Sequence, residues 1–348
     1  MAHAGRPKRS TLADIAAQAG VSIKTVSRVI RREPVSEATR ARVMQVVAAQ
    51  GYRPITAPRS AAGDRSYLIG LLHLPPVSPF VAGLIMGAGK EARKEGYHLL
   101  VEACEVDDAA ARTTWARQLV IQSNLDGIIL TPPLSDDPAI GAMLAELAVP
   151  TCSIAPSGEQ SSGPSVGIDD RRAAREVTEL LLAGGHRAIA FLTGAEGRST
   201  SMRRLAGFED AVRHVEDARP QVMVGDYSFR SGFEAGQTLL AQKNGPTAVF
   251  ASNDEMAAGV LVAAHKLGRS MPESLSVFGF DDSLIASAVW PPLSTVRQPM
   301  EEMGCTSVQL LLDGALRPPA LHQAELRPHR IIAHQIIERE TNGPAPTG

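Results

Sequence analysis

Apolar residues at helical spacing predict three short helices within the first fifty residues. The first helix ends at Gly20, Ser22 is a suitable N-cap for the second, and the third runs from Ser36 to the break at Gly51. Two short helices joined by a glycine-containing turn form a helix-turn-helix. The three predicted apolar stripes are Leu12, Ile15, Ala16 and Ala19; Ile23, Val26, Val29 and Ile30; and Val43, Val46 and Val47.

From Tyr67 onward, apolar runs of strand length alternate with helical segments. Runs that are apolar almost throughout are typical of strands buried on both faces of a parallel sheet. The alternation pauses at 157–165 and then resumes, so we expect two doubly wound lobes with a ligand cleft beyond the carboxyl ends of their strands. Strands are predicted at 67–74, 97–103, 125–132, 149–154, 166–168, 188–194, 222–225, 248–252 and 275–280, and the clearest helices at 80–95, 108–122 and 140–147.

Charge separates the head from the rest of the chain. The formal net charge is only −2, but residues 1–65 hold twelve basic and four acidic residues, and the remainder holds 23 basic and 33 acidic residues. This asymmetry predicts that the head binds a polyanion. Polar side chains on the outer side of the second helix, Lys24 and Arg28 among them, suit phosphates and base edges. An ordinary pair of surface helices is the alternative interpretation.

Sequence motifs for catalysis or metal binding are absent. The segment 83–90 lacks the first glycine and the final hydroxyl residue of a phosphate-binding P-loop, so we expect a helix packed through small residues. The three cysteines and nine histidines show no metal-ligand spacing. Neither an apolar run of the ~18 residues that span a membrane nor a secretory signal is found. We therefore expect a cytoplasmic protein that is not an enzyme and holds no metal or cofactor.

The chain resembles the lactose/galactose-repressor (LacI/GalR) family of bacterial transcription regulators over nearly its whole length. The head segments that carry the resemblance are TLADIAAQAGVSIKTVSRVI at 11–30 and VSEATRARVMQVVAAQGYRP at 35–54. The body segments are SPF at 78–80, GHRAIAFLTG at 185–194, RRLAGF at 203–208, FASNDEMAAG at 250–259, VFGFDDS at 277–283 and PPLSTVRQP at 291–299. The resemblance implies a homodimeric repressor that binds a near-palindromic double-stranded DNA operator and a small effector, usually a sugar or sugar derivative.

The implied architecture is an α/β fold with a three-helix helix-turn-helix head and a periplasmic-binding-protein-like body. The implied divisions are a head at 1–52, a hinge at 53–66, an N-terminal lobe at 67–164 and 294–328, a C-terminal lobe at 165–293 and 329–340, and a disordered tail at 341–348.

The resemblance also implies the residues that bind DNA. Ile23, Lys24 and Arg28 would face base edges in the major groove, and Arg28 suits a guanine. Packing in the head core is the alternative for Ile23. The resemblance and the charge of the linker also imply residues that lie near DNA phosphates, namely Ser22, Thr25, Ser27, Arg53 and Arg59.

For the effector, the resemblance implies Arg204 as the ligand-clamping arginine, Tyr227 as the stacking aromatic, and Asn253 and Asp281 after strands. Carboxylate and guanidinium groups can each engage two adjacent hydroxyls, and an aromatic face covers the C–H surface of a sugar. The alternatives are an Arg204–Asp281 pair, a helix cap at Asn253 and a core position for Tyr227. Weaker candidates at the cleft rim are Phe80, Thr131, Asp169 and Trp290.

Two segments depart from the family pattern. Ile55 and Ala61 replace the asparagine and the wedge leucine of the hinge, and Pro58 interrupts it, so we expect the linker to act mainly through arginines near phosphates. Ala155 and Pro156 stand where many sugar-binding members have an acid. A solute-binding protein of a transport system, an activator and a sugar-modifying enzyme are the competing interpretations.

Overall fold

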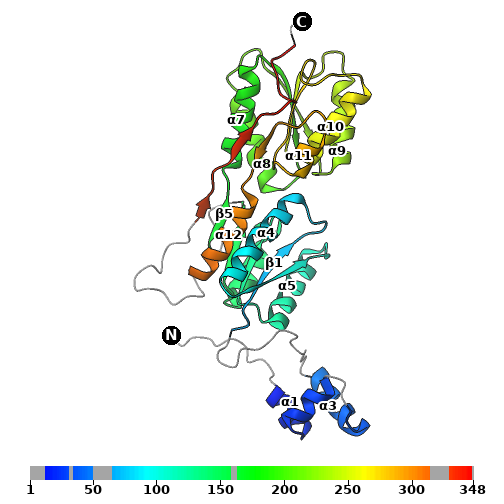
Figure 1. Ribbon diagram of the computed structural model, residues 1–348, viewed down its shortest axis with the longest axis vertical. Helices are drawn as coiled ribbons and strands as arrows, with labels where there is room; N and C mark the ends of the chain where they lie inside the picture. Colours follow the sequence, from blue (N-terminus) through cyan, green and yellow to red (C-terminus); the bar gives the residue numbers. More distant parts are fainter. Residues whose placement is uncertain (1–11, 31–33, 50–64, 158–162, 314–328, 347–348) are drawn as a thin grey trace.

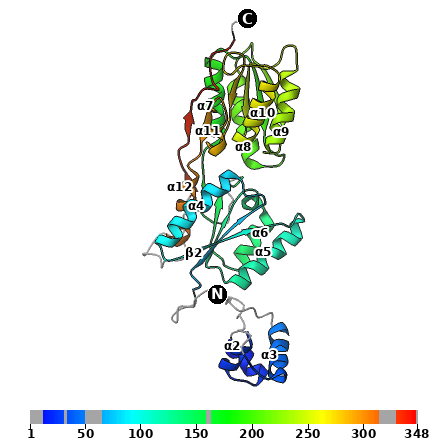
Figure 2. The same ribbon diagram turned by 45° about the vertical axis from the view of Figure 1, so that its right-hand side comes forward.

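The computed structural model describes residues 12–30, 34–49, 65–157, 163–313 and 329–346. The linker positions Ile55, Pro58 and Ala61, and the predicted phosphate contacts Arg53 and Arg59, lie outside the described residues. Figures 1 and 2 show the helical head and two α/β lobes, each lobe with its own sheet.

The head contains the three predicted helices, α1 (Leu12–Ala19), α2 (Ile23–Ile30) and α3 (Glu37–Ala49). Gly20 follows α1 with a φ of +63°, which glycine adopts without steric cost. Ile23 shares the apolar stripe of the second helix in sequence, but it opens α2, one turn before Val26, and is 52% exposed. The head core consists of Ile15, Ala16, Ala19, Val26, Val29 and Val43.

The first lobe is built on a six-stranded parallel sheet in the order β11-β5-β4-β3-β1-β2. Its strands are β1 (Leu68–His73), β2 (His98–Ala103), β3 (Gly127–Leu130), β4 (Thr151–Ile154), β5 (Ser165–Gly167) and β11 (His329–Ile331). The helical segments of this lobe are α4 (Pro79–Lys94), α5 (Ala109–Ser123), η1 (Leu134–Asp136), α6 (Pro138–Glu146) and α12 (Met300–Leu311).

Two strands lie in a different sheet from the one predicted. Residues 165–167 and 329–331 were assigned to the C-terminal lobe, but β5 pairs with β4 and β11 pairs with β5. Both strands therefore complete the first sheet, and the chain passes to the second lobe after β5. Strands of three residues are too short for a hydrophobic period to assign them to a sheet.

The second lobe holds a four-stranded parallel sheet in the order β7-β6-β8-β9. Every residue of β6 and β8 is buried, which confirms the prediction of strands covered on both faces. Its strands are β6 (Ala188–Thr193), β7 (Arg219–Val224), β8 (Ala248–Ala251) and β9 (Ser276–Phe278). Its helices are α7 (Asp170–Ala183), α8 (Ser199–Val212), α9 (Phe229–Leu240), α10 (Asp254–Lys266) and α11 (Leu284–Ala288).

A third pairing, which the sequence did not predict, joins β10 (Thr295–Arg297) to β12 (Gln335–Ile337) in antiparallel register. Asp282 holds this pair to the second sheet, since its carboxylate binds Arg297 and Arg339, each at 2.6 Å.

The C-terminal segment up to residue 346 packs on the second lobe, contrary to the predicted disordered tail. Thr341 is fully buried, and its hydroxyl donates to the carbonyl of Val277 at 2.7 Å. Nε2 of His186 lies 3.1 Å from the carbonyl oxygen of Gly343, and burial lowers the pKa of this histidine. Polar contacts that are distant in sequence thus fix a segment whose composition is typical of disorder.

Helix α4 packs closely on α12, as Figures 1 and 2 show at the first lobe. A Cβ at Gly87 would lie 1.9 Å from the carbonyl oxygen of Glu301, and a Cβ at Gly304 would lie 2.3 Å from that of Leu84. The small residues of 83–90 therefore serve helix packing, as predicted. Across the described ranges, every helix is too short or too polar to cross a bilayer.

Candidate functional site

Four predicted effector residues lie at one edge of the second sheet. Arg204 is on α8 after β6, Tyr227 follows β7, Asn253 follows β8 and Asp281 follows β9. Since these strands are parallel, their carboxyl ends share an edge. The positive φ values of Tyr227 (+70°) and Asp281 (+119°) show that the backbone turns sharply as it leaves β7 and β9.

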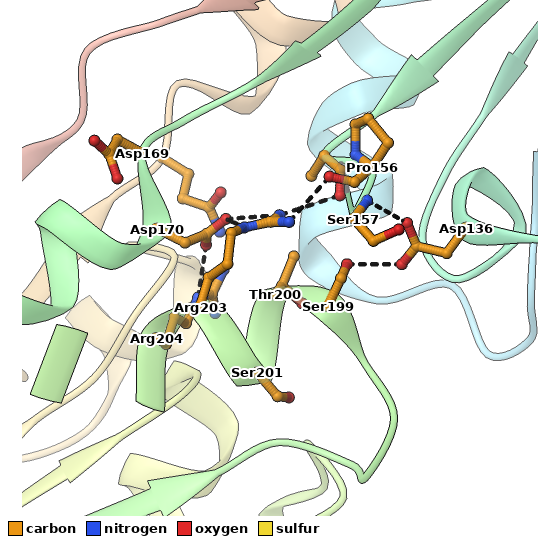
Figure 3. Close-up of polar contacts among 12 residues, drawn as sticks. Asp136, Pro156, Ser157, Asp169, Asp170, Ser199, Thr200, Ser201, Arg203 and Arg204 are labelled. Atoms are coloured by element: carbon orange, nitrogen blue, oxygen red, sulfur yellow. Dashed lines mark hydrogen bonds and ion pairs between the residues drawn. The ribbon is translucent and has the colours of Figure 1, made fainter. Parts of the chain in front are cut away.

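Arg204 is only 4% exposed and is held on three sides. Its Nε donates to Oδ1 of Asp170 at 2.8 Å, its Nη1 donates to the carbonyl of Ser252 at 2.5 Å, and its guanidinium lies 3.6 Å from the ring centre of Phe280. Figure 3 shows Asp170 facing both Arg203 and Arg204. The buried ion pair of Arg204 is therefore with Asp170 rather than with Asp281.

Asp281 is 7% exposed and accepts a hydrogen bond from Nε2 of Gln298 at 2.6 Å. Burial raises the pKa of Asp281 well above its ordinary value, against the opposing charge of Arg204. Burial likewise raises the pKa of the neighbouring Asp254 to about 7, although Thr295 and Ser283 donate to its carboxylate. A hydroxyl donor in the site would stabilise the ionised form of these carboxyl groups and so lower their pKa.

The phenol of Tyr227 is fixed at this edge. Its hydroxyl lies 2.6 Å from Oγ of Ser201, and a Cβ at Gly194 would lie 2.0 Å from its Cζ. The ring also packs partly against the core of the second lobe. A core position for Tyr227 is therefore compatible with a role at the site.

Asn253 caps α10, as the alternative interpretation held. Its Oδ1 accepts from the amide of Met256 at 3.0 Å, and its Nδ2 donates to the carbonyl of Tyr227 and to Glu255, each at 2.9 Å. Asn253 thereby joins the ends of β7 and β8.

The weaker candidates occupy different surroundings. Thr131 is fully buried and donates to the carbonyl of Leu72 at 3.0 Å, while Asp169 is exposed and caps α7. Phe80 is half-buried at the start of α4, and Trp290 is 74% exposed after α11. Three partners of the site were not predicted from the sequence, namely Asp170, Gln298 and Phe280. The paired acids at the end of β5 were a signal for Asp170, but spacing alone did not tell which one is buried.

In the head, the predicted cap and exposed face of α2 are present. Oγ of Ser22 accepts from the amide of Thr25 at 3.1 Å, and Lys24 and Arg28 are exposed. Nη2 of Arg28 donates to the carbonyl of Pro34 at 2.7 Å. Ile23 is exposed, so it does not take the core position that was its alternative. Ser27 lies within α2, but its side chain lies outside the described residues.

Comparisons with known proteins agree over both parts of the chain. Residues 11–54 match the family of bacterial regulatory proteins of the lacI type, and residues 178–341 match a periplasmic binding protein-like domain. The ribose operon repressor of Escherichia coli is 30% identical over 321 residues, covering 91% of this chain and 96% of that protein. The transcriptional regulator CelR of Thermobifida fusca is 32% identical over 322 residues, covering 88% and 92% respectively.

Solved structures match at similar levels. A complex of the transcriptional regulator CelR with cellobiose is 29% identical, with a TM-score of 0.71 over 96% of this chain and all of that one. The Lac repressor dimer bound to operator and the anti-inducer ONPF is 29% identical, with a TM-score of 0.72 over 96% and 99%.

Proposed function

This chain belongs to the lacI family of bacterial regulatory proteins and is a DNA-binding transcriptional regulator, and we propose that it is a repressor controlled by a polyhydroxylated effector. The effector proposal rests on the position of Arg204, Asp281 and Tyr227, which lie together at one edge of the second sheet. A guanidinium, a carboxylate that accepts from hydroxyls and an aromatic ring together suit a sugar.

The relatives support the class of ligand. The names of two of them refer to ribose and cellobiose, and both sugars consist of rings with several hydroxyl groups. Gln298 now donates to Asp281, and we propose that a ligand hydroxyl replaces this amide. Phe80, Asp169 and Trp290 remain proposed rim contacts, whereas the full burial of Thr131 excludes it from the rim.

For the DNA partner we propose a homodimer on a near-palindromic operator, because two-fold protein symmetry imposes two-fold operator symmetry. Ile23, Lys24 and Arg28 are the proposed base contacts, and Ser22, Thr25, Ser27, Arg53 and Arg59 the proposed phosphate contacts. Arg28 would exchange the carbonyl of Pro34 for a guanine edge. Since its partner is DNA, we also propose a cytoplasmic location.

The proposal is tested by DNA selection followed by gel shift. Wild-type protein should enrich a near-palindromic duplex from a random pool, and ribose, cellobiose or a related sugar should change its affinity for that duplex. Asp281→Asn keeps the shape but removes the charge, so calorimetry should show sugar affinity reduced by about 1.5 kcal/mol or more, with operator affinity intact. Equal sugar affinity in the variant would reject Asp281 as a ligand contact. Sugar-strengthened operator binding would indicate a corepressor.

A further inference from the structure

The first two turns of α8 reach from the second lobe to the first. Oγ of Ser199 donates to Oδ2 of Asp136 at 2.7 Å. Nη1 of Arg203 donates to the carbonyl of Pro156 at 2.9 Å, and its Nη2 donates to that of Ala155 at 3.2 Å. Figure 3 shows Asp136, Pro156 and Arg203 around this junction. These three contacts join the lobes directly, through groups of the protein alone.

The acceptors on the first lobe are held in place by that lobe. Oδ1 of Asp136 accepts from the amide of Ser157 at 2.6 Å, which orients the other carboxylate oxygen toward Ser199. Ala155 has a φ of +45°, and its amide donates to the carbonyl of Val166 on β5 at 2.7 Å. The backbone turn at Ala155 is thus tied to the sheet, and its carbonyl loses little further freedom when it accepts from Arg203.

Asp170 connects this junction to Arg204. The carboxylate is 1% exposed and divides its oxygens between two arginines, with Oδ1 bound by Nε of Arg204 at 2.8 Å and Oδ2 by Nη2 of Arg203 at 3.2 Å. A buried carboxylate that is bound by two arginines cannot follow one of them without weakening its contact with the other. A ligand that draws Arg204 toward itself therefore alters the position of Arg203.

We propose that Ser199, Arg203 and Asp136 form an interlobe clamp that holds the lobes together before any effector binds, and that Arg203 is a positioning residue that reports occupancy of Arg204 to the first lobe. The clamp rests on contacts between residues of this chain, whereas the reporting role rests on the proposed function. Charge-assisted bonds from Arg203 are the stronger part of the clamp, and the hydroxyl bond of Ser199 is the weaker part.

The clamp is tested by spin-label distances in the full-length protein without ligand. Labels are placed at Thr114→Cys on α5 and Lys243→Cys after α9, both exposed, in a Cys305→Ser background. Ser199→Ala, Arg203→Gln and their double variant should broaden and lengthen the interlobe distance, and the population of separated lobes should rise about tenfold or more in the double variant.

The matched control is Arg171→Gln, which removes an arginine that pairs with Asp210 wholly within the second lobe. It should leave the distance distribution unchanged. Ser199→Ala preserves the Arg203–Asp170 pair, so it provides a folded variant if Arg203→Gln is unstable. Wild-type distances in Ser199→Ala and in every folded Arg203 variant would overturn the clamp.

The reporting role is tested with ribose and cellobiose as probes. Arg203→Gln should reduce the sugar-induced change in operator affinity at least tenfold while sugar affinity changes less, and Arg203→Lys should restore part of it. An unchanged sugar response in Arg203→Gln would overturn the reporting role. If neither sugar alters operator binding by the wild type, the effector proposal fails for these sugars, and the ligand-free distances still decide the clamp.

Discussion

Replacing Arg204 with methionine tests how the charges buried in the second lobe are held. Methionine keeps an unbranched apolar side chain but removes the guanidinium that binds Asp170 and Ser252 and lies over Phe280. Asp170 is 1% exposed, so water cannot readily replace the lost partner. The variant therefore measures the cost of leaving a buried carboxylate with only Arg203 beside it.

The magnitude follows from the geometry. Removing one member of a buried ion pair costs about 3–5 kcal/mol. Arg203 remains 3.2 Å from Asp170, so we expect the lower end, a loss of about 3 kcal/mol in the free energy of unfolding. Adding Asp170→Asn removes the uncompensated charge, and the double variant should lose only about 1–2 kcal/mol.

Urea unfolding followed by circular dichroism measures these differences. Arg171→Met is the control, because Arg171 is 58% exposed in its pair with Asp210 and should contribute about 0–1 kcal/mol. A cost below about 1 kcal/mol for Arg204→Met, or a double variant as unstable as the two single losses combined, would refute the reasoning.

Three further predictions concern other parts of the molecule. Gly194→Ala should displace the Tyr227 ring and lower the free energy of unfolding by about 1–3 kcal/mol, measured by thermal unfolding. Adding Tyr227→Ala should recover part of that loss, and an unchanged stability of Gly194→Ala would mean that the ring is not confined there. Arg28→Ala should weaken operator binding by about 1–3 kcal/mol and relax selectivity at one base pair per half-site, measured by gel shift on operator variants; equal weakening on all sequences would show a phosphate contact. Because burial raises the pKa of Asp254 to about 7, the folded chain keeps a proton there that the unfolded chain releases near pH 4. The stability contributed by that proton is therefore present at low pH and is lost as pH rises toward about 7, by up to about 1.4 kcal/mol per unit. Urea unfolding at pH 5, 6 and 7 should show a smaller dependence in Asp254→Asn, and identical slopes would contradict the shifted pKa.

Local patterns in the sequence were enough to predict most of the helices and strands. Helical spacing identified α1, α2 and α3, and apolar runs identified the long strands of both sheets, because solvent exclusion acts on each segment through its own period. The family resemblance led to Arg204, Tyr227, Asn253 and Asp281, which do share one edge, beyond the parallel strand ends where a ligand is expected.

Contacts between distant segments decided the rest. The sequence presented Asp169 and Asp170 as equivalent acids, yet folding leaves the first as an exposed helix cap and buries the second beside Arg204. The sheet of β5 and the order of the segment at Thr341 were likewise fixed by partners far away in the chain. A periodic pattern reports which side of an element is buried, whereas the identity of a buried partner depends on how several elements pack, and only the tertiary structure determines that.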